Sequence, residues 1–125
     1  MGQAAILVID DDKHLVEMIQ LYLEAQGYVV YTAQDGVHAH PLADARHPAL
    51  IIMDVDMPMT DGLKALGQLR EDKKTAGIPV ILLTGVVSSH VYPIIQEMPK
   101  VSHIKKPIQL EDLLSMVRHY VPNVD

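Results

Sequence analysis

Short unbroken runs of apolar residues alternate along the chain with longer segments in which apolar residues recur every three or four positions. The unbroken runs are residues 5–9, 50–53 and 79–83, with a weaker run at 101–104. Buried parallel strands have this unbroken character, whereas the spaced pattern is typical of helices that bury one face. Residues 28–32 alternate in the manner of a half-buried strand. The pattern therefore predicts five strands separated by helices.

Capping and breaking residues indicate where the helices begin and end. The first helix has Asp12 as its N-cap and Gly27 as its stop signal. Pro41 and Pro93 favour helix starts just before them, because proline is tolerated only in the first turn. The remaining helices are predicted near residues 40–46, 63–70, 92–98 and 110–121. Five strand and helix units with short connections predict one α/β domain, a parallel sheet covered on both faces.

Polar residues suited to phosphate chemistry follow four of the predicted strands. They are the run of three aspartates that begins at Asp10, then Asp54, Thr84 and the pair formed by Lys105 and Lys106. Each of these groups, taken alone, also has a purely structural explanation: a solvated turn with a helix cap, a threonine that favours strands, or a surface lysine. The carboxyl ends of parallel strands meet at one edge, so the four groups are expected to lie together. Strand alternation allows only one of the two lysines to enter such a site.

Composition narrows the range of functions. The chain has 125 residues, a formal net charge of −6 and no cysteine, which excludes disulfides and thiolate metal sites. It contains no cluster of lysine and arginine, which argues against direct binding of nucleic acid through phosphates. No apolar stretch approaches the roughly 20 residues that span a bilayer, and no secretory signal is recognisable. We therefore expect a single domain over residues 1–125, with a cytoplasmic location and no membrane contact.

The motifs that carry these polar groups also resemble those of a known family. Residues 5–12, 50–62, 79–85 and 105–107 closely resemble the receiver domain of two-component response regulators, of the kind found in chemotaxis regulators. The resemblance covers about residues 5–120 in order, spacing and strand context. It implies a flavodoxin-like three-layer sandwich with five parallel strands in the order 2-1-3-4-5. Two helices are then expected on one face of the sheet and three on the other.

The resemblance implies a phosphoryl acceptor beside a metal site. Asp54 stands at the family's phosphoacceptor position, which takes a phosphoryl group from a histidine kinase or a phosphotransfer protein. Asp10 and Asp11 stand at the acidic pair that binds Mg²⁺ together with Asp54, and Asp56 at the position whose backbone carbonyl completes the metal site. Gly62 occupies the place of the family's turn glycine before the third helix.

The resemblance also implies a switch that couples phosphorylation to a distant surface. Thr84 and Lys106 stand where the family binds phosphoryl oxygens and begins the change. The surface of the fourth helix, fifth strand and fifth helix would then control a downstream partner or a missing output domain, with the chain a monomer or a weak dimer through this surface. His103 occupies a position where the family usually has tyrosine or phenylalanine. It is a possible switch residue, and the alternative is a half-exposed surface histidine.

Two other functions remain open. A receiver-fold interaction module could signal without phosphorylation. A small Mg²⁺-dependent phosphatase is the other alternative, because Asp54 and Asp56 after an apolar strand imitate the paired acids of such enzymes. The order of the motifs argues against the phosphatase, whose nucleophilic strand comes first. We therefore expect no turnover of a separate substrate.

Overall fold

The computed structural model describes residues 4–55, 62–85 and 91–122, which form five strands and the helices between them. None of the helices in these ranges has the length and apolar character that crossing a bilayer requires. In chain order the elements are β1 Ala5–Ile9, α1 Lys13–Ala25, β2 Val29–Ala33, the 3-10 helix η1 Gly36–His38, α2 Ala39–Arg46, β3 Leu50–Asp54, α3 Gly62–Glu71, β4 Val80–Thr84, α4 Val91–Glu97, β5 Val101–Lys105 and α5 Leu110–Tyr120.

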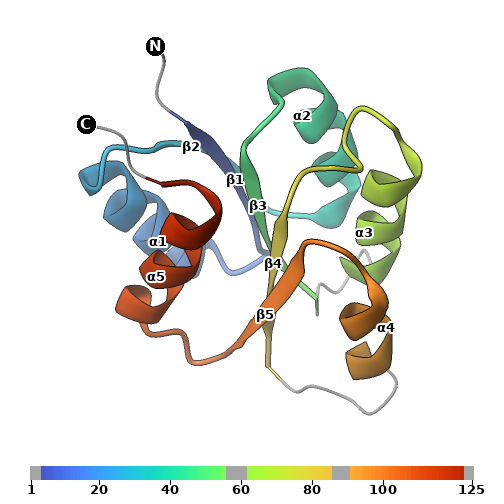
Figure 1. The fold of residues 1–125 in the computed structure, drawn as a ribbon. Coiled ribbons are helices and arrows are strands. Elements are labelled where there is room, and N and C mark those ends of the chain that lie inside the picture. Colours follow the sequence, from blue (N-terminus) through green and yellow to red (C-terminus); the bar gives the residue numbers. More distant parts are fainter. Residues whose placement is uncertain (1–3, 56–61, 86–90, 123–125) are drawn as a thin grey trace.

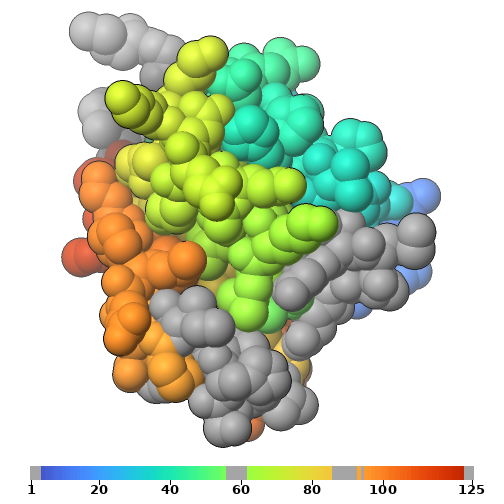
Figure 2. Space-filling view, turned by 90° about the vertical axis from the view of Figure 1, so that its right-hand side faces the viewer, coloured from blue at the N-terminus to red at the C-terminus, as the bar shows by residue number. Residues whose placement is uncertain are grey.

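The strands form one parallel sheet in the order β2-β1-β3-β4-β5. Helices α1 and α5 cover one face, and α2, α3 and α4 cover the other (Figure 1). Figure 2 shows the three-helix side, with α2, α3 and α4 spread across it. The doubly wound sheet, its strand order and its two-and-three division of helices confirm the predicted fold class.

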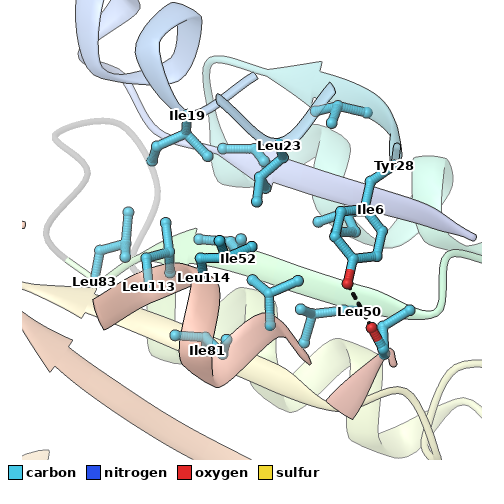
Figure 3. Close-up of a cluster of buried hydrophobic side chains, with 14 of the residues drawn as sticks. Ile6, Ile19, Leu23, Tyr28, Leu50, Ile52, Ile81, Leu83, Leu113 and Leu114 are labelled. Carbon is cyan, nitrogen blue, oxygen red and sulfur yellow. Dashed lines mark hydrogen bonds between the residues drawn. The ribbon is translucent and has the colours of Figure 1, made fainter. Parts of the chain in front are cut away.

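Two apolar cores lie on the two faces of the sheet. Along β1, Ile6 and Val8 pack toward α1 and α5, whereas Leu7 and Ile9 pack toward α2, α3 and α4. Figure 3 shows the first of these cores, in which side chains from α1 and α5 meet those of the strands. Every residue of β3 and β4 is buried, as the unbroken apolar runs predict. This burial fixes the register that aligns the strand ends.

The ends of α1 form as their capping residues predict. Asp12 is the N-cap, and its Oδ1 accepts a hydrogen bond from the Leu15 N–H at 3.2 Å. At the other end Gly27 has φ 98°, a left-handed conformation that suits glycine. The N–H groups of Gly27 and Tyr28 donate to the carbonyls of Glu24 and Leu23, which closes the last turn.

The segment before α2 differs from the prediction by one short element. Asp35 caps the turn Gly36–His38, since its Oδ1 accepts the backbone N–H of His38 at 3.1 Å. Helix α2 then begins at Ala39, one residue before the predicted start, with Pro41 in its first turn. The capping aspartate supplies the local hydrogen bond that an isolated apolar pattern does not reveal.

Buried polar groups at the amino edge of the sheet, where the strands begin, are bonded to backbone carbonyls. The hydroxyl of Thr75 is fully buried and donates to the Leu69 carbonyl at 2.6 Å, which satisfies the last turn of α3. The Tyr28 hydroxyl donates to the Val121 carbonyl at 2.6 Å, the bond drawn as a dashed line in Figure 3. These bonds connect helix ends to the rest of the fold.

Candidate functional site

Three aspartates meet at the carboxyl edge of the sheet, where β1 and β3 end side by side. Oxygen atoms of Asp10, Asp11 and Asp54 all lie within 4.8 Å of one another. Asp10 is 0% exposed and Asp54 2% exposed, whereas Asp11 is exposed to solvent. The register places Ile9 of β1 beside Met53 of β3, so the two buried acids follow from neighbouring strands. The site is thus buried on one side and open on the other.

Lys106 connects the two buried acids. Its Nζ lies 3.2 Å from Oδ2 of Asp10 and 3.3 Å from Oδ2 of Asp54. The backbone holds the lysine in place, because its N–H donates to the Thr84 carbonyl at 2.7 Å directly after β5. The peptide bond that joins Lys106 to Pro107 is cis. Of the two adjacent lysines, Lys106 is therefore the one that enters the site, and Lys105 is exposed.

The sequence predicted Lys106 as a partner for phosphoryl oxygens, and the structure adds a second pairing. The same ammonium group forms an ion pair with each of the two buried carboxylates. A signal for this was present in the sequence, because carboxylates are almost never fully buried unless something pairs with them. The arrangement leaves one positive charge between two negative ones.

Burial and charge shift the protonation equilibria at this edge. Burial, helped by the nearby charge of Asp54, raises the pKa of the Asp10 carboxyl to about 6, against the lowering effects of the Asp12 N–H and of Lys106. Partial burial lowers the pKa of the Lys106 ammonium, but attraction to Asp10 and Asp54 outweighs this, and the net shift is upward. Two ionised carboxylates beside a single lysine would leave an excess of negative charge, and this excess adds to burial in favouring the neutral form of Asp10.

Thr84 is the last residue of β4 and is 1% exposed. The register pairs Asp54 with Leu83, so Thr84 lies one residue beyond that pair on the adjacent strand. Its hydroxyl donates to the Ile104 carbonyl at 3.4 Å, a long hydrogen bond. The threonine therefore belongs to the same edge of the sheet as the acids and the lysine.

Gly62 begins α3 in direct contact with the strand that carries Asp54. Its N–H donates to the Val55 carbonyl at 3.2 Å. A Cβ atom at this position would lie 2.6 Å from the Asp54 carbonyl oxygen and 2.7 Å from the Val55 Cα. Only glycine allows this approach, and α3 can therefore begin against the backbone of Asp54.

Two further residues, Asp56 and His103, were predicted to belong to the site. Asp56 falls outside the described residues. His103 lies on β5 beside Leu82 of β4 and is partly buried. By strand alternation it shares a face with Val101, which packs on the core under α2, α3 and α4. The part that His103 plays in switching stays a prediction.

The three carboxylates fit a hard divalent cation. Mg²⁺ takes oxygen ligands, usually one or two carboxylates together with water and phosphate oxygens. Oδ2 of Asp10 is buried and accepts no hydrogen bond from the described residues, although Lys106 forms an ion pair with it. Asp11 provides an exposed oxygen on the open side of the cluster. This donor set suits Mg²⁺ better than a thiolate- or imidazole-preferring metal.

The fold and this edge together define a class of protein. The chain is an α/β domain with a doubly wound parallel sheet that gathers a lysine and three acids, which could hold a metal ion, at its carboxyl edge. The family model described as the response regulator receiver domain matches residues 6–118. The chain belongs to this family.

Individual relatives agree with this assignment. The chain is 34% identical over 122 residues to the DNA-binding dual master transcriptional regulator RpaA of Synechocystis, covering 96% of this chain and 50% of that protein. It is 26% identical to the polar-differentiation response regulator DivK of Brucella ovis, covering 94% and 95%. The solved structure of the Vibrio cholerae chemotaxis protein CheY4 superposes with a TM-score of 0.88 at 27% identity, covering 96% and 100%. The chain thus spans half the length of the first relative and nearly all of the second.

Proposed function

We propose that this chain accepts a phosphoryl group on Asp54 from a histidine kinase or a phosphotransfer protein in a two-component pathway. The observation that supports this most is the position of Lys106, whose Nζ lies 3.2 Å and 3.3 Å from two buried carboxylates at the end of the sheet. A buried carboxylate beside a cation, open to solvent through Asp11, suits attack on a phosphoryl group delivered from outside.

The transfer exchanges one bond to phosphorus for another. A carboxylate oxygen of Asp54 forms the new bond, and the bond between phosphorus and the imidazole nitrogen of the donor breaks. The imidazole leaves with the electron pair and takes up a proton. Lys106 and the Thr84 hydroxyl then bind phosphoryl oxygens, which requires each to exchange its present partner for the new group.

Asp10, Asp11 and Asp54 would hold Mg²⁺, with the backbone carbonyl of Asp56 as a further ligand. When bound, the ion supplies positive charge beside the phosphoryl oxygens, where negative charge is otherwise crowded. The exposed position of Asp11 leaves the metal site open to the donor protein.

Phosphorylation would act on the surface formed by α4, β5 and α5. Thr84 and Lys106 directly border β5, since the threonine hydroxyl bonds to Ile104 and the lysine follows Lys105. Movement of these two residues toward a phosphoryl group would shift an existing equilibrium of this surface, with His103 as a further switch position. The surface would control a downstream partner or an output domain.

The remaining features follow from the same proposal. Residues 1–125 form a single receiver domain, located in the cytoplasm, that assists its own phosphorylation but turns over no separate substrate. RpaA is described as DNA-binding, but the chain described here spans half of that protein, and we propose that this domain does not itself bind nucleic acid. The domain is a monomer or a weak dimer through the surface of α4, β5 and α5.

Incubation with acetyl phosphate tests the proposal, with intact-mass and peptide mass spectrometry as the measurement. We expect one phosphoryl group on the wild type, located on Asp54, when Mg²⁺ is present and none when it is removed by a chelator. Asp54→Asn abolishes the mass increase, because an amide is not a nucleophile of this kind. Asp112→Asn, at an exposed position in α5, serves as the matched control and keeps it.

A wild-type protein that gains no phosphoryl group under these conditions would contradict the proposal and favour the interaction module. Modification that persists in Asp54→Asn would place the acceptor elsewhere. Release of phosphate from a small ester by the purified chain would revive the phosphatase.

A further inference from the structure

Arg70 is a partly buried cation near the opposite end of α3 from Gly62, and it has no part in the chemistry of the candidate site. It lies in the last turn of α3, and its Nη2 lies 3.4 Å from the carbonyl oxygens of both Pro99 and Lys100. Its Nε and Nη1 are buried and make no hydrogen bond to the described residues. Burial lowers the pKa of this guanidinium. Burying two nitrogen atoms of a guanidinium without hydrogen bonds is unfavourable, so a compensating interaction is expected at this position.

The carbonyls that Arg70 reaches belong to the junction between α4 and β5. Lys100 has φ 59°, a left-handed turn that directs the chain from the helix into the strand. The Lys100 carbonyl also accepts a hydrogen bond from the Val80 N–H at 2.9 Å. The side-chain Nζ of Lys100 donates to the Gly77 carbonyl at 3.3 Å. The junction is thus held by α3 and by the residues that lead into β4.

We propose that Arg70 anchors the carboxyl-terminal end of α4 to α3, so that any displacement of α4 pivots about the junction at Pro99 and Lys100. Figures 1 and 2 show α4 beside α3 on the same face of the sheet. A helix of seven residues is about 10 Å long, and fixing one end restricts movement largely to the other. Arg70 is a positioning residue, and its connection with signalling rests on the function proposed above.

A simpler role for Arg70 makes a different prediction. A cation in the last turn of a helix is stabilised by the helix dipole, wherever its head group points. That role requires only a positive charge and does not involve the α4–β5 junction. The anchor instead requires the bonds to the Pro99 and Lys100 carbonyls, and its loss should loosen these residues specifically.

Hydrogen exchange of the unphosphorylated protein, followed by mass spectrometry, separates the two roles. Arg70→Met keeps the apolar stem and removes the donors. We expect exchange at residues 98–101 to become about tenfold faster, while residues 6–9 of β1 keep the wild-type rate. The control is Arg118→Met, because Arg118 is an exposed arginine whose Nη2 donates to Gln26 at 3.1 Å. It should leave residues 98–101 unchanged.

Unchanged exchange at residues 98–101 in Arg70→Met overturns the anchor, and so does an equal acceleration across the whole chain. Arg70→Lys provides a second test that keeps the charge, and it decides the matter if the methionine variant does not fold. Its shorter side chain should give a smaller acceleration confined to residues 98–101. Wild-type exchange in Arg70→Lys would assign the residue to the helix dipole.

A second comparison links the anchor to phosphorylation. With acetyl phosphate and Mg²⁺, we expect wild-type exchange to change at residues 91–95 and much less at residues 98–101, whereas in Arg70→Met both segments change. Equal changes at both segments in the wild type would overturn the pivot. If the wild type gains no phosphoryl mass, the proposed function fails, and the exchange of the unphosphorylated variants still decides whether Arg70 is an anchor.

Discussion

The two edges of the central sheet treat buried polar groups in opposite ways. At the amino edge, the hydroxyls of Thr75 and Tyr28 donate to the backbone carbonyls of Leu69 and Val121, each at 2.6 Å. At the carboxyl edge, Asp10 and Asp54 instead share one lysine, and an oxygen of Asp10 lacks a hydrogen bond from any described residue. The hydroxyls of the first edge are bonded to the backbone, whereas the two carboxylates of the second are paired with a side chain that can move.

This difference separates stability from function. The hydroxyls of Thr75 and Tyr28 make short bonds to carbonyls and stabilise one arrangement, whereas the Thr84 hydroxyl at the carboxyl edge makes only a long bond of 3.4 Å. A lysine shared by two carboxylates can exchange one of them for an incoming anion. The amino edge therefore supports the fold, and the carboxyl edge retains the unbalanced charge that binding of metal and phosphoryl groups would relieve.

Gly62→Ala should have the largest effect, because at this position one substitution should lower both the stability of the fold and the phosphorylation of the site. The added Cβ would lie under 3.0 Å from backbone atoms of Asp54 and Val55, which cannot move without moving the acceptor. We expect a loss of about 3 kcal/mol in the free energy of unfolding. Phosphorylation by acetyl phosphate should also be lost, as measured by intact mass.

Gly67→Ala is the matched control in the same helix. A Cβ at Gly67 meets nothing within 4 Å, and alanine favours helix more than glycine does. It should stabilise the protein by about 0.5 to 1 kcal/mol in denaturant unfolding and leave phosphorylation intact. Equal losses in the two variants would show that the contact with the acceptor strand is not the cause.

The pH dependence of stability tests the charge imbalance at the carboxyl edge. Burial raises the pKa of Asp10 from its ordinary value of 3.8 to about 6, so folding favours the protonated form. The stability that this group contributes is present below pH 3.8 and is lost as the pH rises through about 6. In a chelator, Asp10→Asn should therefore gain stability relative to the wild type between pH 4 and pH 7, by about 2 to 3 kcal/mol.

The measurement is urea unfolding of both proteins at each pH, with the difference between them taken to cancel the other titrating groups. Asp112→Asn, at an exposed site, should show no such trend. A constant difference between Asp10→Asn and the wild type across this range would contradict the assigned shift.

A substitution at the amino edge should have a smaller effect, on stability alone. Thr75→Val removes the hydroxyl that bonds to the Leu69 carbonyl and leaves that buried acceptor without its partner. We expect a loss of about 2 kcal/mol in unfolding free energy and no change in phosphorylation by mass spectrometry. Thr75→Ser keeps the hydroxyl and should recover most of the loss. A phosphorylation defect in the valine variant would mean that the two edges are not independent.

Most of the fold could be predicted because its strands are unbroken apolar runs. The run at 50–53 leads straight into Asp54, and in the structure all five residues are buried in β3. The same logic predicted that Asp10, Asp54 and one of Lys105 and Lys106 would meet, since parallel strands end at one edge, and the family resemblance indicated Lys106. These apolar patterns predict the strands reliably because each residue of a buried strand must itself be apolar.

The features that sequence reasoning missed depend on tertiary partners. Thr75 belongs to a polar stretch that predicts only a loop, yet it is fully buried because it caps α3. Arg70 has the sequence context of a solvated helix end, and the approach of the α4–β5 junction accounts for its partial burial. A single sequence does not record which carbonyl lies opposite a given donor, so these bonds are seen only in the folded structure.

The three consecutive aspartates after β1 have three different environments. Asp10 is buried and paired with Lys106, Asp11 is exposed beside the cluster, and the carboxylate of Asp12 caps α1. The turn from strand to helix points each successive side chain in its own direction. The three aspartates are therefore not interchangeable: if one is substituted, neither of the other two is placed to make its contacts.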